Sequence, residues 1–140
     1  MTYSEIQLLE DLEAMGQLIA AQDNAGCYAL ECKAPQTGQE LQDVWHDHWN
    51  VEPPESILGP LTDAQRVAYV GAAYDSLFAR LSDHCTKQRN QASLLKLCPP
   101  TGIARLWPDA DPETDEFNCA QKMVRDGYTV LCDGEVYVHR

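Results

Sequence analysis

The stretch YTVLCDGEVYVH, residues 128–139, decides the fold class of this 140-residue chain. Two runs rich in β-branched and aromatic residues flank Asp133-Gly134, a dipeptide that is typical of the tight type I′ turn. The stretch therefore predicts a β-hairpin close to the end of the sequence. Upstream of it, residues 103–107 have the composition of another short strand.

A helix is expected between that strand and the hairpin. Asp111 followed by Pro112 is typical of a helix start, and Gly127 suits the first position beyond a helix end. The acidic run 109–116 also resembles the opening of a calcium loop, but Thr114 stands where that loop needs a glycine. The run is therefore interpreted as carboxylates placed at the N-terminus of a helix.

Two helices are predicted in the first fifty residues, each with a capping box at its start. The first follows Ser4, with Gln7 three residues on, and stops near Gly26. The second follows Thr37, with Glu40 three residues on. The expected apolar stripes are Leu8, Leu12, Met15 and Ile19 in the first helix, and Leu41, Val44, Trp45, His48 and Trp49 in the second.

The middle of the chain is predicted to hold a loop and then the longest helix. Residues 51–60 include three prolines and are interpreted as a loop. A helix from Thr62 to Cys85 is favoured because apolar residues keep a helical period along it. Residues 92–98 either prolong this helix or form another, and residues 27–33 are either a short strand or the end of a helix.

This order of elements predicts an α+β protein. A helical N-terminal two-thirds, with three to four helices, is followed by a strand, a helix and the C-terminal hairpin. Residue 60 marks a change of composition between an acidic helical half, 1–60, and a second half, 61–140, with a helix and the α/β elements. We expect the halves to form one compact domain or two small lobes.

Charge is distributed unevenly between these halves. The first sixty residues contain eleven carboxylates and one basic side chain, Lys33, so they carry −10 of the total formal charge of −12. A protein with this charge repels nucleic acid and anionic lipid, and basic proteins are its natural electrostatic partners. The sequence therefore argues against direct binding to nucleic acid or to a membrane.

Five of these carboxylates are predicted to face outward on the first two helices. Three of them, at i, i+3 and i+7 of the second helix, are separated by about 4.5 Å and then about 6 Å along its axis, the length scale of a nucleic-acid backbone. Trp45 and Trp49, one turn apart, either pack in the core or anchor a partner. The residues expected to bind a partner are Glu10, Glu13, Glu40, Asp43, Asp47, Trp45 and Trp49.

The six cysteines carry only a weak metal signature. Cys27 and Cys32, followed by His46, are loosely spaced, whereas structural zinc sites usually show two tight pairs. The sequence also lacks the P-loop, the G-x-S-x-G, H-E-x-x-H and G-x-G-x-x-G motifs. We therefore expect reduced thiols, no cofactor, no metal and no catalytic residues.

A small acidic chain with such a face resembles the inhibitor proteins that phages and mobile elements encode against host nucleic-acid machinery, anti-CRISPR proteins among them. The resemblance is to a class of proteins, rests on residues 5–55 and covers less than half of the chain. It implies a non-enzymatic inhibitor, a nucleic-acid mimic whose acidic surface docks on a basic nucleic-acid-binding protein or ribonucleoprotein complex. Docking would block the access of nucleic acid or of a nuclease.

Three other functions fit the same sequence. They are an immunity or antitoxin-like protein that masks a basic nuclease, a small metal- or cysteine-dependent enzyme, and a phage structural adaptor. The first residues lack the basic and then apolar order of a secretory signal, and no run of about 18 apolar residues occurs. A cytoplasmic location is therefore expected, in the host if a phage encodes the chain.

Overall fold

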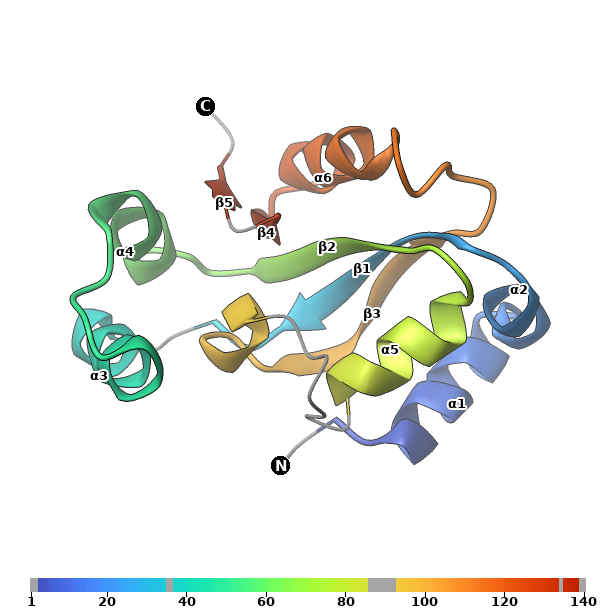
Figure 1. Cartoon of the computed structure of the whole chain (residues 1–140), viewed down its shortest axis with the longest axis horizontal. Helices are drawn as coiled ribbons and strands as arrows, with labels where there is room; N and C mark the ends of the chain where they lie inside the picture. Colours follow the sequence, from blue (N-terminus) through green and yellow to red (C-terminus); the bar gives the residue numbers. More distant parts are fainter. Residues whose placement is uncertain (1–2, 35–36, 86–92, 134, 139–140) are drawn as a thin grey trace.

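The computed structural model describes residues 3–34, 37–85, 93–133 and 135–138. Its centre is a mixed five-stranded sheet in the order β3-β1-β2-β4-β5, with helices on both faces (Figure 1). The strands are β1 (Gly26–Cys32), β2 (Val67–Ala73), β3 (Pro100–Trp107), β4 (Thr129–Cys132) and β5 (Glu135–Tyr137). The helices are α1 (Glu5–Ala14), α2 (Leu18–Asp23), α3 (Gly38–Trp49), α4 (Glu55–Thr62), α5 (Leu77–Cys85) and α6 (Glu116–Arg125), with a 3₁₀ turn η1 (Ser93–Lys96). The α+β class is confirmed.

The pairing of the strands unites the two halves of the sequence. β1 is antiparallel to both of its neighbours, β2 and β3, whereas β2 and β4 are parallel. β1 comes from the acidic half and lies between two strands of the second half, and α4 crosses the composition boundary at residue 60. The acidic helices and the C-terminal elements are therefore built on one sheet.

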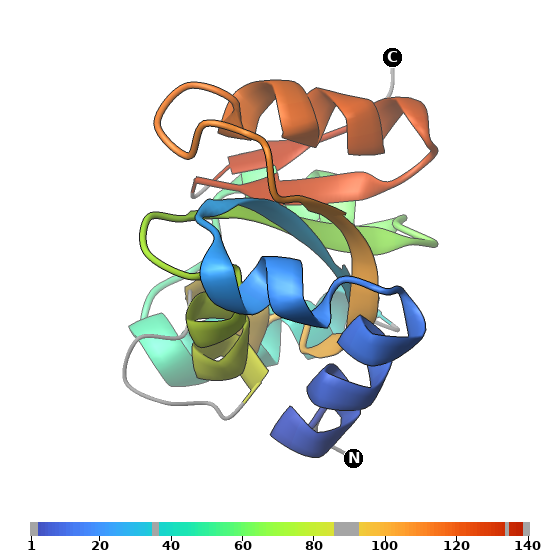
Figure 2. The same cartoon turned by 90° about the vertical axis from the view of Figure 1, so that its right-hand side faces the viewer.

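Helices cover the two faces of the sheet unequally. α6 lies over one face, and α1, α2 and α5 lie over the other (Figure 2). α3 and α4 lie at the end of the sheet where β2 begins, at the left of Figure 1, away from α1 and α2. Alternate residues of β1 reach the two faces: Tyr28 and Leu30 join the core beneath α1 and α5, whereas Cys27 and Ala29 join the core beneath α6.

The first predicted helix is interrupted. Its capping box is present, but α1 ends at Ala14 and α2 begins at Leu18, with Gly16 between them at a φ of +69°. Glycine adopts this left-handed conformation without the penalty that a side chain brings. The helix is broken at this turn, and the predicted buried stripe does not continue beyond it. Met15 and Ile19 are both exposed.

The predicted helix from Thr62 to Cys85 is wrong over its first part and correct at its end, where α5 spans Leu77–Cys85, and the loop predicted over residues 51–60 extends only to Pro54. Residues 67–73 are strand β2, and Thr62 ends α4 instead of capping a helix. The strand is covered on both faces, so its sequence shows a continuous apolar run in place of alternation. Pro54 directly precedes α4 as its N-cap residue, and Pro60 lies inside the helix.

Other expectations are met. Thr37 caps α3 by accepting a hydrogen bond from the backbone N–H of Glu40 at 3.0 Å, and α3 buries Leu41 and Trp45. The side chain of His48 lies outside the described part of the chain. The undecided residues 27–33 are largely β1, and residues 92–98 contain only the short η1, residue 92 lying outside the described ranges.

The C-terminal elements follow the prediction with one shift. β3 contains the predicted strand 103–107, and β4 pairs antiparallel with β5 as a hairpin, although Gly134 and His139 lie outside the described residues. α6 begins at Glu116 and not directly after Asp111, whose carboxylate instead accepts a hydrogen bond from the N–H of Glu113 at 2.9 Å within a preceding turn. Gly127, at a φ of +98°, follows α6 as predicted.

Candidate functional site

The outer face of α3 carries the predicted acidic ridge, which we define as Glu40, Asp43 and Asp47. All three side chains are exposed. The helix is fixed in this orientation because Leu41 and Trp45, on its other face, are buried in the core. No ion pair joins Asp43 or Asp47 to a cation within the described ranges. Asp43 accepts a hydrogen bond from the side-chain amide of Gln39 at 2.9 Å, so its position on the exposed face is supported by a neutral neighbour one turn away.

The remaining two predicted carboxylates lie elsewhere. Glu10 and Glu13 are exposed on α1. α1 and α3 lie at opposite ends of the sheet (Figure 1), so the structure divides the predicted acidic surface into two. A partner that covers the ridge would have to extend along the whole molecule to reach Glu10 and Glu13.

The two tryptophans of α3 belong mainly to the core. Trp45 is only 8% exposed and stacks on the ring of Trp49, with 4.2 Å between the ring centroids. Trp49 is half-buried and packs against the same core. Trp45 is therefore unavailable as an exposed anchor, and it supports the ridge from below.

The cysteines do not assemble the loose zinc set that the sequence contains. Cys27 lies in the core beneath α6, whereas Cys32 lies in the core on the other face of the sheet, so the two thiols point away from each other. Burial raises the pKa of the Cys27 and Cys85 thiols to about 12. A nucleophilic cysteine needs a lowered pKa, so these thiols have the properties of core residues.

A buried polar pair lies in the core beneath α5. The Tyr28 hydroxyl is 2.5 Å from Nε2 of His84, and His84 is fully buried. Burial, followed by the charge of Arg80, lowers the pKa of His84 to about 3, so the ring is neutral and shares a hydrogen bond with the phenol through Nε2. The pair satisfies two polar groups inside an otherwise apolar layer.

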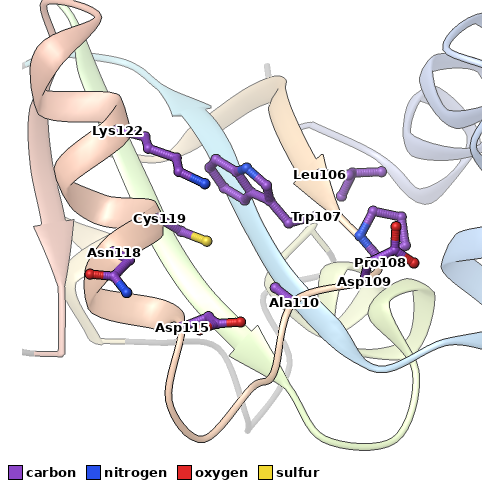
Figure 3. Close-up of a pocket in the computed structure, with 9 residues that line it drawn as sticks. All are labelled: Leu106, Trp107, Pro108, Asp109, Ala110, Asp115, Asn118, Cys119 and Lys122. Atoms are coloured by element: carbon purple, nitrogen blue, oxygen red, sulfur yellow. The ribbon is translucent and has the colours of Figure 1, made fainter.

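A cavity of about 400 Å³ lies between α6 and the loop that follows β3 (Figure 3). Its helix wall consists of side chains at i, i+3, i+4 and i+7 of one face, namely Asp115, Asn118, Cys119 and Lys122. Facing them is Trp107, whose ring lies 5.1 Å from the guanidinium carbon of Arg105. The cavity combines an indole wall with charges of both signs, so it selects neither anions nor cations.

A second cavity, of about 320 Å³, lies beside the first turn of α6 and the β4–β5 turn. We call it the aromatic cavity. It is lined by three aromatic side chains and three carboxylates, namely Tyr74, Phe117, Tyr137, Glu113, Glu116 and Asp133. The sequence prediction missed it because these residues come from separate segments, and Phe117 is 55% exposed although it is a large apolar side chain.

No protein-family model, curated protein or solved structure matches this chain. Among the described residues, no group of three or more His, Cys, Asp or Glu side chains is arranged to hold a metal ion. None of the helices in those ranges is long and apolar enough to cross a membrane.

Proposed function

We propose that the protein is a non-enzymatic inhibitor of the anti-CRISPR or anti-defence type, which docks through its acidic ridge on a basic nucleic-acid-binding protein or complex. Docking blocks the access of nucleic acid or of a nuclease to that partner. The observation that carries the proposal is the ridge: three carboxylates exposed on one face of α3, in a half of the chain whose only basic side chain is Lys33.

The physics of the ridge supports this proposal. Two like charges that are three or four residues apart on a helix cost a few tenths of a kcal/mol of helix stability. Lysine or arginine side chains of a partner would relieve that cost. Glu52 and Glu55, both exposed, continue the negative charge from α3 to the start of α4. Complementary charge gives fast association that weakens as salt screens it.

The test is charge reversal with a matched control. Asp43→Lys with Asp47→Lys reverses the ridge, and Asp23→Lys with Asp63→Lys changes the net charge equally at exposed positions near the C-terminal ends of α2 and α4. Lysine is favoured at such helix ends, so the control should fold normally. Proteins captured from host lysate at low salt are identified, and displacement of nucleic acid from each captured protein is measured.

We expect the natural chain and the control to capture a basic nucleic-acid-binding protein and to displace its nucleic acid, and the ridge variant to do neither. Circular dichroism should show the same melting curve for all three proteins. The proposal fails if the ridge variant binds as the natural chain does, or if no nucleic-acid-binding protein is captured. Capture of a single nuclease whose activity is suppressed would identify the immunity or antitoxin-like function, and salt-insensitive capture of a structural protein would identify an adaptor.

A further inference from the structure

The aromatic cavity has two walls of exposed aromatic side chains. Tyr74, which follows β2, is 63% exposed, and Phe117, in the first turn of α6, is 55% exposed. Phe117 meets Tyr137 of β5 edge to face, with 5.8 Å between the ring centroids, which makes a fixed corner. Large aromatic side chains that gather at the surface are typical of interaction sites.

The same cavity is strongly negative. Glu113, Glu116 and Asp133 line it, no lysine or arginine is among the described lining residues, and none of the three carboxylates forms an ion pair within the described part of the chain. Glu116 is held in place because the Cys132 thiol donates a hydrogen bond to its Oε1 at 3.3 Å. The pKa of the Tyr137 hydroxyl is raised, first by burial and then by the surrounding negative groups.

We propose that the aromatic cavity binds the guanidinium group of an arginine side chain from a basic polypeptide. A guanidinium is planar, so it stacks on tyrosine and phenylalanine rings while it donates paired hydrogen bonds to carboxylates. The volume, about 320 Å³, lies at the lower end of the range for ligand sites. A neutral or anionic side chain would bring no positive charge to the three carboxylates.

The inference goes beyond the acidic ridge because it concerns another surface. Tyr74 follows the end of β2 that points away from α3 (Figure 1), and none of the residues that line the cavity belongs to α3. The ridge needs no particular shape in its partner, whereas the cavity selects one side chain. The cavity would therefore bind arginine even if the ridge bound nothing.

The test uses a blocked Gly-Arg-Gly tripeptide as the ligand and the same peptide with citrulline as its neutral isostere. Both are titrated into the full chain while backbone amide resonances are recorded by NMR. We expect the arginine peptide to shift resonances around Tyr74, Phe117 and Tyr137, and the citrulline peptide to bind at least about fivefold more weakly. Absence of binding by the arginine peptide, equal binding of the two peptides, or shifts confined to α3, would overturn the inference.

Protein variants assign the binding to this cavity. Glu113→Gln with Asp133→Asn removes two of the lining charges, and its matched control is Asp23→Asn with Asp63→Asn, which removes two exposed charges elsewhere. We expect the cavity variant to lose about fivefold or more in affinity for the arginine peptide and the control to be unchanged. If the two variants bind alike, the effect is one of net charge and the cavity is not the site.

The aromatic walls and the ridge are tested separately. Phe117→Leu keeps an apolar side chain but removes the aromatic face, and it should weaken the arginine peptide about fivefold. The ridge variant Asp43→Lys with Asp47→Lys should bind the peptide as tightly as the natural chain does, because no residue of α3 lines the cavity. Loss of binding in the ridge variant, or full binding by Phe117→Leu, would contradict the assignment.

Discussion

The two faces of the sheet are packed by different means. Beneath α1 and α5 the side chains are large, and Tyr28, Tyr69 and His84 place their rings together, 5.4 to 6.3 Å apart between centroids. Beneath α6 the sheet contributes small residues, among them Cys27 and Ala29, to a layer with the thiol of Cys119. One face therefore depends on the fit of a few large rings, whereas the other depends on the close approach of a single helix.

The two layers are therefore sensitive to different kinds of substitution. On the face with the rings, Gly71 leaves room for the ring of Tyr28. The hydrogen bond with His84 satisfies the Tyr28 hydroxyl. On the α6 face, the contacts are many and small, so losing one leaves little empty space. The surfaces proposed for binding, on α3 and beside α6, are supported by these two layers respectively.

The largest effect is expected from Gly71→Ala. Gly71 lies directly opposite Tyr28 in the antiparallel pair, and an added Cβ would overlap the Tyr28 hydroxyl oxygen and lie 2.7 Å from its Cζ. We expect a loss of about 3 kcal/mol in the free energy of unfolding, the upper end of the usual cost of overpacking, measured by urea denaturation. Gly102→Ala is the control, because a Cβ there meets no atom closer than 3.9 Å.

If Gly71→Ala and Gly102→Ala unfold at the same urea concentration, the packing of Tyr28 over β2 is not as tight as described. A variant that gains stability at Gly102 would still agree with the prediction. Replacing a glycine by alanine where space allows stabilises by restricting the unfolded chain.

Gly71 also shows why part of the fold could not be predicted from the sequence. The segment Val67–Ala73 contains a glycine and three alanines, and without its neighbours it is as compatible with a helix as with a strand. What decides the outcome is pairing with β1, whose Tyr28 covers the glycine. Local signals did suffice where capping or turn chemistry was strong, as at Ser4, at Thr37 and in the β4–β5 hairpin.

The candidate sites divide in the same way. The ridge could be predicted, because Glu40, Asp43 and Asp47 belong to one helix and its period places them together. The aromatic cavity could not, because Tyr74, Phe117 and Tyr137 meet only through the order of strands in the sheet and the placement of α6. Sequence reasoning reaches sites within one element, and a site between elements needs the tertiary structure.

A smaller effect is expected from protonation of His84 on the face with the rings. The pKa of His84 in the folded protein is about 3, against 6.5 for an ordinary histidine, so the unfolded chain binds the proton more readily. The associated stability is therefore complete above pH 6.5 and is lost as the pH falls from there toward 3. From pH 8 to pH 5 the loss is about 2 kcal/mol for this one group.

The measurement is the free energy of unfolding in urea at pH 8 and at pH 5, for the natural chain and for His84→Gln. The variant is expected to be less stable at pH 8 but to lose about 2 kcal/mol less between the two pH values. His46→Gln, at an exposed position of α3, is the control and should keep the full dependence. If the free energy of unfolding of His84→Gln falls as much between pH 8 and pH 5 as that of the natural chain, burial does not lower the pKa of His84.

The smallest effect is expected on the α6 face, from the thiols of Cys27 and Cys119. Both are buried in the same cluster of the core beneath α6. A buried free thiol behaves as a small apolar group, so Cys27→Ala and Cys119→Ala should each cost about 1 kcal/mol in urea denaturation. Because the two side chains belong to one cluster, the double variant should cost less than the sum of the single ones. A loss above about 3 kcal/mol in either single variant would contradict the contrast between the faces. The α6 face would then depend on single side chains as strongly as the face with the rings does.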